Sequence, residues 1–97
     1  MDIQILDFDC SRIKTIYIYE IVKEIFSKDC KEFNYVCDVI RENVEKKLGE
    51  RDWSVIEMPF SVYSISYNQM VKIKVDKFIY VIFSLNKEKS NIFNCFF

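Results

Sequence analysis

The chain has 97 residues, of which 51% are hydrophobic and 16% aromatic, so it can form one folded domain and is too apolar to be intrinsically disordered. Its net charge is −1 and it contains no histidine, which argues against nucleic-acid binding and excludes histidine-ligated metals and histidine-based catalytic triads. With no secretory signal, no run of transmembrane length and no Cys-x-x-Cys pair, we expect a reduced, intracellular, soluble protein that does not bind membranes.

The N-terminal part of the chain predicts an extended segment followed by an amphipathic helix. Residues 1–10 alternate imperfectly between apolar and polar types, and Ser11 is a candidate N-cap, with Asp9 competing for that position. Apolar residues recur at steps of three and four, which is the spacing of one helical face, at Ile13, Ile16, Tyr17, Ile21, Val22, Ile25 and Phe26. We expect this helix to end shortly after that stretch.

A second helix carries the clearest signals in the chain. Apolar residues from Phe33 to Leu48 follow the helical spacing, and Lys46 and Lys47 lie in the last turn, where the helix dipole favours positive charge. Gly49, the only glycine, stands where a left-handed residue closes many helices.

After the second helix the apolar period changes to two, which predicts strands. Residues 53–58 alternate, and Pro59 marks a strand end, a bulge or an edge because it cannot donate a ladder hydrogen bond. Residues 60–67 alternate with a slip in phase, for which a β-bulge is the usual cause. Residues 70–75 and 78–83 predict a final hairpin with a tight turn between them. The element order indicates an α+β fold, with two helices packed on an antiparallel β-sheet.

Enzymatic signals are weak, and we expect neither a cofactor nor a bound metal. The acidic residues show no defined partner spacing, and a single glycine cannot build a phosphate-binding loop. Cys37 falls on the apolar stripe of the second helix, which favours a buried, inert thiol. A thiol-dependent redox protein that uses Cys30 or Cys37 is the remaining enzymatic alternative.

Residues 60–67 offer the best binding signal. They alternate large apolar side chains with serines and begin just after Pro59, so their main-chain groups could accept another extended chain. The alternative is an ordinary internal strand.

The order and identity of these segments resemble the small peptide-binding class of dynein light chain (light chain types 1 and 2), over about residues 12–85. Members of that family follow two helices with a strand that opens on a tryptophan. A phenylalanine, a small residue and a tyrosine then begin the next strand. The matching segments here are Trp53-Ser54-Val55-Ile56, then Phe60, Ser61 and Tyr63, and, on the second helix, Tyr35-Val36-Cys37-Asp38-Val39-Ile40-Arg41 and Val44-Glu45-Lys46-Lys47-Leu48.

The chain departs from the family pattern at several glycines, which are replaced by Met58, Ser61 and Asp76, and it lacks the family's histidines. The alignment of the last two strands is also ambiguous. Residues 78–80 resemble the family's Phe-Ile-Tyr strand, which would make residues 92–97 the final strand. We prefer residues 70–75 and 78–85 as the final hairpin, because that alignment needs only a one-residue gap.

The resemblance implies a strand-exchanged homodimer in which residues 60–67 of one protomer pair with the partner's sheet. A partner peptide would add beside this strand by β-strand addition, in a groove walled by the second helix of the other protomer. The site residues so implied are Asn34, Phe60, Ser61, Val62, Tyr63, Ser64, Ile65, Ser66, Met70, Lys72 and Lys74.

The function implied is that of a non-enzymatic subunit of a dynein motor complex, or of a dimerising hub that binds short linear motifs. Its partners would be the dynein intermediate chain or other linear-motif proteins, and its location the cytoplasm and cytoskeleton. The alternative is a structural subunit that keeps the dimer fold without binding peptides.

We divide the chain into a light-chain-like domain, residues 1–85, and a C-terminal tail, residues 86–97. The tail holds four large apolar residues after a polar bridge, and we expect them to pack on an apolar patch at the sheet edge or the partner groove. A frayed end is the alternative.

Overall fold

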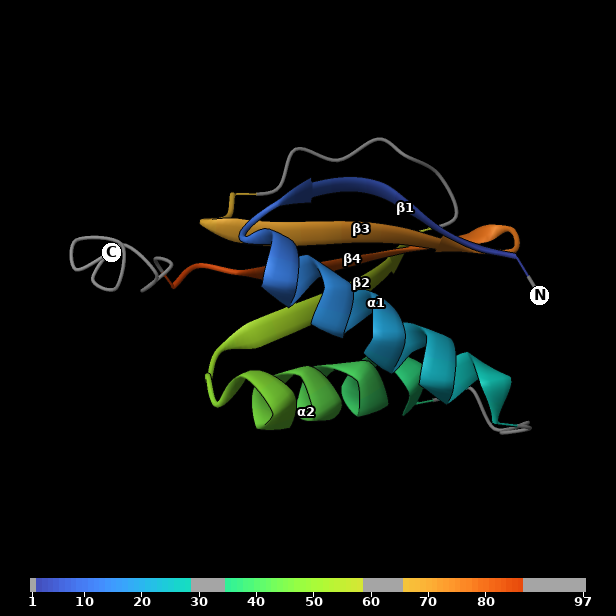
Figure 1. The fold of residues 1–97 in the computed structure, drawn as a ribbon, viewed down its shortest axis with the longest axis horizontal. Helices are drawn as coiled ribbons and strands as arrows, with labels where there is room; N and C mark the ends of the chain where they lie inside the picture. Colours follow the sequence, from blue (N-terminus) through green and yellow to red (C-terminus); the bar gives the residue numbers. More distant parts are fainter. Residues whose placement is uncertain (1, 29–34, 59–65, 87–97) are drawn as a thin grey trace.

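The computed structural model describes residues 2–28, 35–58 and 66–86 (Figure 1). Its elements, in chain order, are β1 (Ile3–Asp9), α1 (Arg12–Ser27), α2 (Val36–Leu48), β2 (Trp53–Met58), β3 (Gln69–Val75) and β4 (Phe78–Ser84). The four strands form one antiparallel sheet in the order β1-β3-β4-β2, and both helices cover the same face. The predicted α+β fold is confirmed.

Local capping sets the ends of the helices. The side chain of Ser11 accepts a hydrogen bond from the Lys14 amide at 3.3 Å, so the predicted N-cap of α1 is confirmed. Gly49 closes α2 with φ of 66°, a left-handed conformation in which a Cβ atom would be strained. The structure begins α2 at Val36, whereas the predicted start, Phe33, lies outside the described residues.

The final hairpin pairs β3 with β4 through a tight turn at Asp76 and Lys77, as the sequence predicts. Asp76 has φ of 52°, a value that aspartate tolerates better than most residues. The described bulge lies in β1, where the pairing register with β3 shifts around Leu6. The bulge predicted within residues 60–67 falls between Val62 and Tyr63, which lie outside the described residues, while Ser66 and Tyr67 are described and are not in a strand.

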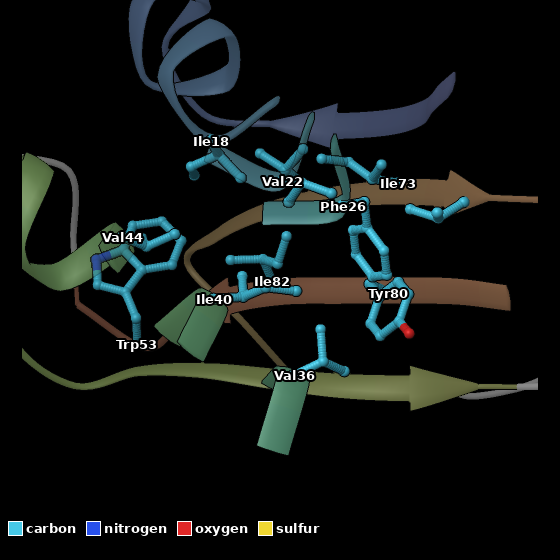
Figure 2. Close-up of a cluster of buried hydrophobic side chains, with 12 residues drawn as sticks. Ile18, Val22, Phe26, Val36, Ile40, Val44, Trp53, Ile73, Tyr80 and Ile82 are labelled. Atoms are coloured by element: carbon cyan, nitrogen blue, oxygen red, sulfur yellow. The ribbon is translucent and has the colours of Figure 1, made fainter. Parts of the chain in front are cut away.

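The main core lies between the helices and the sheet (Figure 2). Ile18 and Val22 of α1, Ile40 of α2, and Ile73 and Ile82 of the central strands have no exposed surface. Burial of one such side chain contributes roughly 1.5–3 kcal/mol. On α2 and on the central strands the core side chains repeat every four and every second position, as the two periods predict. On α1 the predicted apolar stripe is only partly confirmed. Val22 and Phe26 enter the core, but Ile13 and Ile16 are exposed by 64% and 47%, because the face that α1 turns to the sheet runs through positions 15, 18, 22 and 26.

A smaller apolar cluster lies on the opposite face of the sheet. Its centre is formed by Met58, Met70 and Val81, each with less than 5% of its surface exposed. Ile79 and Phe83 pack against this cluster and are partly buried. Both faces of β4 are therefore covered by apolar contacts, which explains its unbroken apolar sequence. No helix in the described part of the chain is long and apolar enough to span a membrane.

Candidate partner-binding edge of the sheet

The outer edge of β2 is the first candidate site. β2 is the last strand in the sheet order and pairs only with β4 among the described residues, so no described strand occupies its outer side. α2 packs beside it and supplies a wall along that side (Figure 1). An open edge with a helical wall is the geometry that could hold an extended chain.

Three residues of α2, spaced four apart, face this edge: Cys37, Arg41 and Glu45. The Glu45 carboxylate accepts a hydrogen bond from the main-chain amide of Trp53 at 3.2 Å. The other oxygen of the same carboxylate accepts a hydrogen bond from the Arg41 guanidinium at 3.1 Å. Glu45, which is held in place by Arg41, therefore ties α2 to Trp53, the first residue of β2.

Hydrogen bonds at both ends of β2 show which of its amides point outward. The Trp53 amide bonds to Glu45, and the Glu57 main chain hydrogen-bonds to the Cys37 thiol. In an antiparallel ladder, outward-facing amides recur at every second residue, so the amide and carbonyl of Val55 also point outward. They have no partner among the described residues, and they form the centre of the edge.

At the Glu57 end of the β2 edge, two ionisable side chains, Cys37 and Tyr80, remain uncharged. Burial, followed by the charges of Glu57 and Asp38, raises the pKa of the Cys37 thiol. The Tyr80 hydroxyl donates to the Glu57 carboxylate at 2.8 Å, and burial together with this bond raises the pKa of Tyr80 well above its usual range. Both groups therefore keep their protons at neutral pH.

A polar cluster fixes the start of β2 against the rest of the fold. The Lys14 ammonium donates to the Glu50 carboxylate at 2.6 Å and to the Gln69 side-chain oxygen at 2.8 Å. The second Glu50 oxygen accepts from the Trp53 indole at 3.0 Å, and Gln69 donates to the Asn86 carbonyl at 2.9 Å. These bonds connect α1 with β2 and β3 and with the residues that follow α2 and β4.

A hollow of about 520 Å³ opens beside this cluster, at the α2 end of the β2 edge. Its walls mix charged side chains with apolar ones, and Arg41 is the only basic residue among them. The residues that line it are Arg41, Glu45, Asp52, Trp53, Ser54, Phe83, Leu85 and Asn86.

No protein-family model matches the chain, and no curated protein matches it. Among solved structures, the dynein light chain-like domain of the calcium-binding protein FhCaBP2 from Fasciola hepatica is similar to it, with a TM-score of 0.66 and 15% sequence identity. The likeness covers 90% of this chain and 95% of that domain. The chain has a dynein light chain-like fold. At this identity the likeness concerns the fold alone, and not a class of light chain.

Within this light-chain-like fold, most of the expected site residues fall outside the described part of the chain. This holds for Asn34 and for residues 60–65, while Ser66 is described and exposed. Met70 is buried in the smaller apolar cluster, and Lys72 and Lys74 are half-buried on the same face of β3. β3 lies between β1 and β4, so these three side chains do not lie along the β2 edge.

Arg41, Glu45 and Glu57 belong to the candidate site but are not among the residues expected from the sequence. The usable signal was the i, i+4 spacing of positions 37, 41 and 45, which places them on one side of the apolar stripe of α2. What the sequence could not supply is which strand lies beside that side of the helix. Among the described residues, no three His, Cys, Asp or Glu side chains are grouped as a metal site would need.

Proposed function

We propose that this chain is a non-enzymatic interaction module that dimerises and binds extended segments of partner proteins by strand addition. The observation that carries the proposal is the open outer edge of β2, with the Val55 main chain at its centre and α2 as its wall. The dynein light chain-like fold supports a small binding or adaptor role.

In the proposed dimer, residues 60–67 of one protomer pair with the β2 edge of the other. Pro59 gives the chain a reason to leave its own sheet after β2, because proline cannot continue the ladder. The partner peptide then adds to the exposed side of the exchanged strand, next to α2, and residues 61–66 supply the main-chain bonds. In this arrangement Asn34 lies at the rim of the groove.

The biological setting that we propose is a dynein motor complex, or a dimeric hub, in the cytoplasm and cytoskeleton. The dynein intermediate chain or another protein with a short linear motif would be the peptide donor. A redox function has less support, because the raised pKa of Cys37 lowers the fraction of reactive thiolate at neutral pH.

The variant Val55→Pro tests the proposed dimer. Proline removes the outward amide of Val55 and is tolerated on an edge strand, whereas Val55→Ala keeps the amide and is the matched control. By sedimentation at micromolar concentration, we expect Val55→Ala to remain a dimer and Val55→Pro to be a monomer with an unchanged circular dichroism spectrum. A wild-type monomer would contradict the proposal, as would a dimeric Val55→Pro variant.

Hydrogen exchange gives an answer even if Val55→Pro does not fold. The Val55 amide of the wild-type chain should be protected in the dimer and should exchange faster on dilution, while the Ile56 amide, which faces β4, stays protected. Titration with a light-chain recognition peptide should shift backbone resonances of residues 60–68 and of the α2 wall. A stable dimer with no such shifts would instead favour the structural subunit.

A further inference from the structure

The outer edge of β1 is the second unpaired edge of the described sheet. β1 pairs with β3 on its inner side, and no described strand pairs with its other side. Its apolar side chains remain exposed, Ile5 by 38%, Leu6 by 44% and Phe8 by 48%. A seven-residue strand with exposed apolar residues and open main-chain groups is a site at which another strand can add.

The hydrogen-bond pattern identifies the outward main-chain groups of β1. The Asp76 amide donates to the Asp2 carbonyl at 2.7 Å, so Asp2 faces β3. The alternation of an antiparallel ladder then turns Ile3 and Ile5 outward. The Phe8 amide, in contrast, is occupied by the carboxylate of the preceding residue at 2.8 Å. The open groups are therefore concentrated in the first half of β1.

A hollow of about 310 Å³ lies beside this half of the strand, between β1 and α1. Its size is at the lower end of the range of ligand pockets, and its aromatic walls suit one aromatic side chain. The residues that line it are Asp2, Ile3, Tyr19, Lys23, Phe26 and Ser27.

We propose that a C-terminal segment of this chain, residues 92–97, adds to the outer edge of β1 as an antiparallel strand. The segment reads Ile92-Phe93-Asn94-Cys95-Phe96-Phe97 and lies outside the described residues. It contains four large apolar side chains, and leaving them in water would be unfavourable. The proposal goes beyond the proposed function, because it concerns the opposite outer strand.

The place where β4 ends allows this segment to reach β1. Ser84 pairs with Gln69, and Met70, the next residue of β3, pairs with Asp9. The chain therefore leaves β4 beside the C-terminal end of β1. Three strand spacings, about 14 Å, separate β4 from a new strand beyond β1. Residues 87–91 can span about 17 Å. A segment that continues along β1 from this end runs antiparallel to it, in keeping with the rest of the sheet.

The alternation of side chains in residues 92–97 matches the alternation of side chains along β1. One register places Phe97 opposite Ile3. Cys95 then lies opposite Ile5. Because the bulge adds one residue to β1, Phe93 comes opposite Phe8. Opposed side chains share a face, so Phe93, Cys95 and Phe97 cover the helix side, with Phe97 at the hollow. Ile92 and Phe96 then lie on the other face of the sheet.

Charge favours this segment over a second copy of β1. β1 and the residue before it carry three carboxylates, Asp2, Asp7 and Asp9, and no basic residue. Pairing two such strands edge to edge would bring like charges together. The polar bridge that precedes residue 92 instead carries Lys87 and Lys89, and it passes the end of β1 that holds two of the three carboxylates.

A disulfide tests the proposed register. In a chain whose three other cysteines are changed to serine, Ile5→Cys should form an intrachain disulfide with Cys95 on mild oxidation. Opposed Cα atoms in such a pair lie about 5.5 Å apart, within the disulfide range. Ile56→Cys is the matched control, because Ile56 lies on the other outer strand with 39% exposure. We expect the disulfide with Cys95 to form at least about tenfold faster in the Ile5→Cys variant than in the Ile56→Cys variant.

Equal rates at the two positions, or a disulfide mainly between two chains, would overturn the proposal. A second measurement compares the full chain with one that ends at Asn91. The Ile3 and Ile5 amides should exchange at least about tenfold faster in the shorter chain, and the Ile82 amide of the core should not change; unaltered exchange of Ile3 and Ile5 also overturns the proposal. The shorter chain should still dimerise through β2, so failure of the dimer would count against the proposed function alone.

Discussion

Lys14 joins α1 to the start of β2 and β3, and its replacement should destabilise the whole fold. Its ammonium contacts Glu50 at 2.6 Å and Gln69 at 2.8 Å, and the side chains of Lys14 and Glu50 are only 16% and 18% exposed. Lys14→Met keeps most of the aliphatic stem and the helix propensity while it removes the charge. The variant leaves a largely buried carboxylate without its ion pair and the Gln69 oxygen without a donor.

The expected cost is about 3 kcal/mol. Breaking a fully buried ion pair costs roughly 3–5 kcal/mol, and the residual exposure of Lys14 and Glu50 reduces this to about 2 kcal/mol. The Gln69 side chain has no exposed surface, so the loss of its donor adds about 1 kcal/mol. For a domain of this size, such a change lowers Tm by roughly 15 °C.

Urea denaturation of wild type, Lys14→Met and Lys28→Met measures this difference. Lys28 forms an ion pair with Glu24 in which both side chains are about two-thirds exposed, so its loss should cost at most about 0.5 kcal/mol. A double-mutant cycle with Glu50→Gln, which keeps an acceptor for the Trp53 indole, isolates the Lys14–Glu50 coupling. Equal costs for the two lysine variants, or a coupling energy near zero, would refute the reasoning.

Three further predictions follow from single residues. Because the pKa of Tyr80 is raised, its protonated form stabilises the fold below the ordinary tyrosine pKa of about 10. That contribution is lost as pH rises further, by about 1.4 kcal/mol per pH unit. Above pH 10, the urea stability of Tyr80→Phe should therefore fall less steeply than that of wild type; parallel curves would contradict the assignment. Gly49→Ala should cost about 1 kcal/mol in the same assay, because its φ of 66° strains a Cβ atom although there is space for one. Because burial raises the pKa of Cys37, iodoacetamide should alkylate it with a rate midpoint above that of an ordinary exposed thiol, and a midpoint near neutrality would instead revive the redox alternative.

The parts of the fold that the sequence predicts are those set by near neighbours. Ser11 caps the amide three residues ahead, and Gly49 closes the helix that it follows, so both signals lie within one turn. The final hairpin joins adjacent strands through two residues, and its alternating pattern fixes which side chains enter the core. The bulge in β1 also had a local signal, since the apolar positions 3, 5 and 8 change parity after Ile5.

The candidate site depends on contacts between distant residues, and these do not follow from periodicity. Gln69 contacts Lys14 across 55 positions, and Glu57 and Cys37 meet only because α2 packs beside β2. Met70, Lys72 and Lys74 would lie beside the groove only if β3 neighboured it, and periodicity does not give the order of the strands. The sheet order β1-β3-β4-β2 separates them from the β2 edge by a whole strand.

The two outer strands together decide how many chains can join one sheet. If β1 and β2 were both open, one protomer could accept a strand at each edge, and association between unlike edges need not close into a dimer. A discrete dimer therefore requires that one edge be covered or otherwise protected, and residues 92–97 would cover β1. The chain that ends at Asn91 should then form assemblies larger than a dimer as its concentration rises, which light scattering would detect. If this shorter chain remains a dimer at high concentration, the acidic side chains and the bulge of β1 are enough to protect that edge.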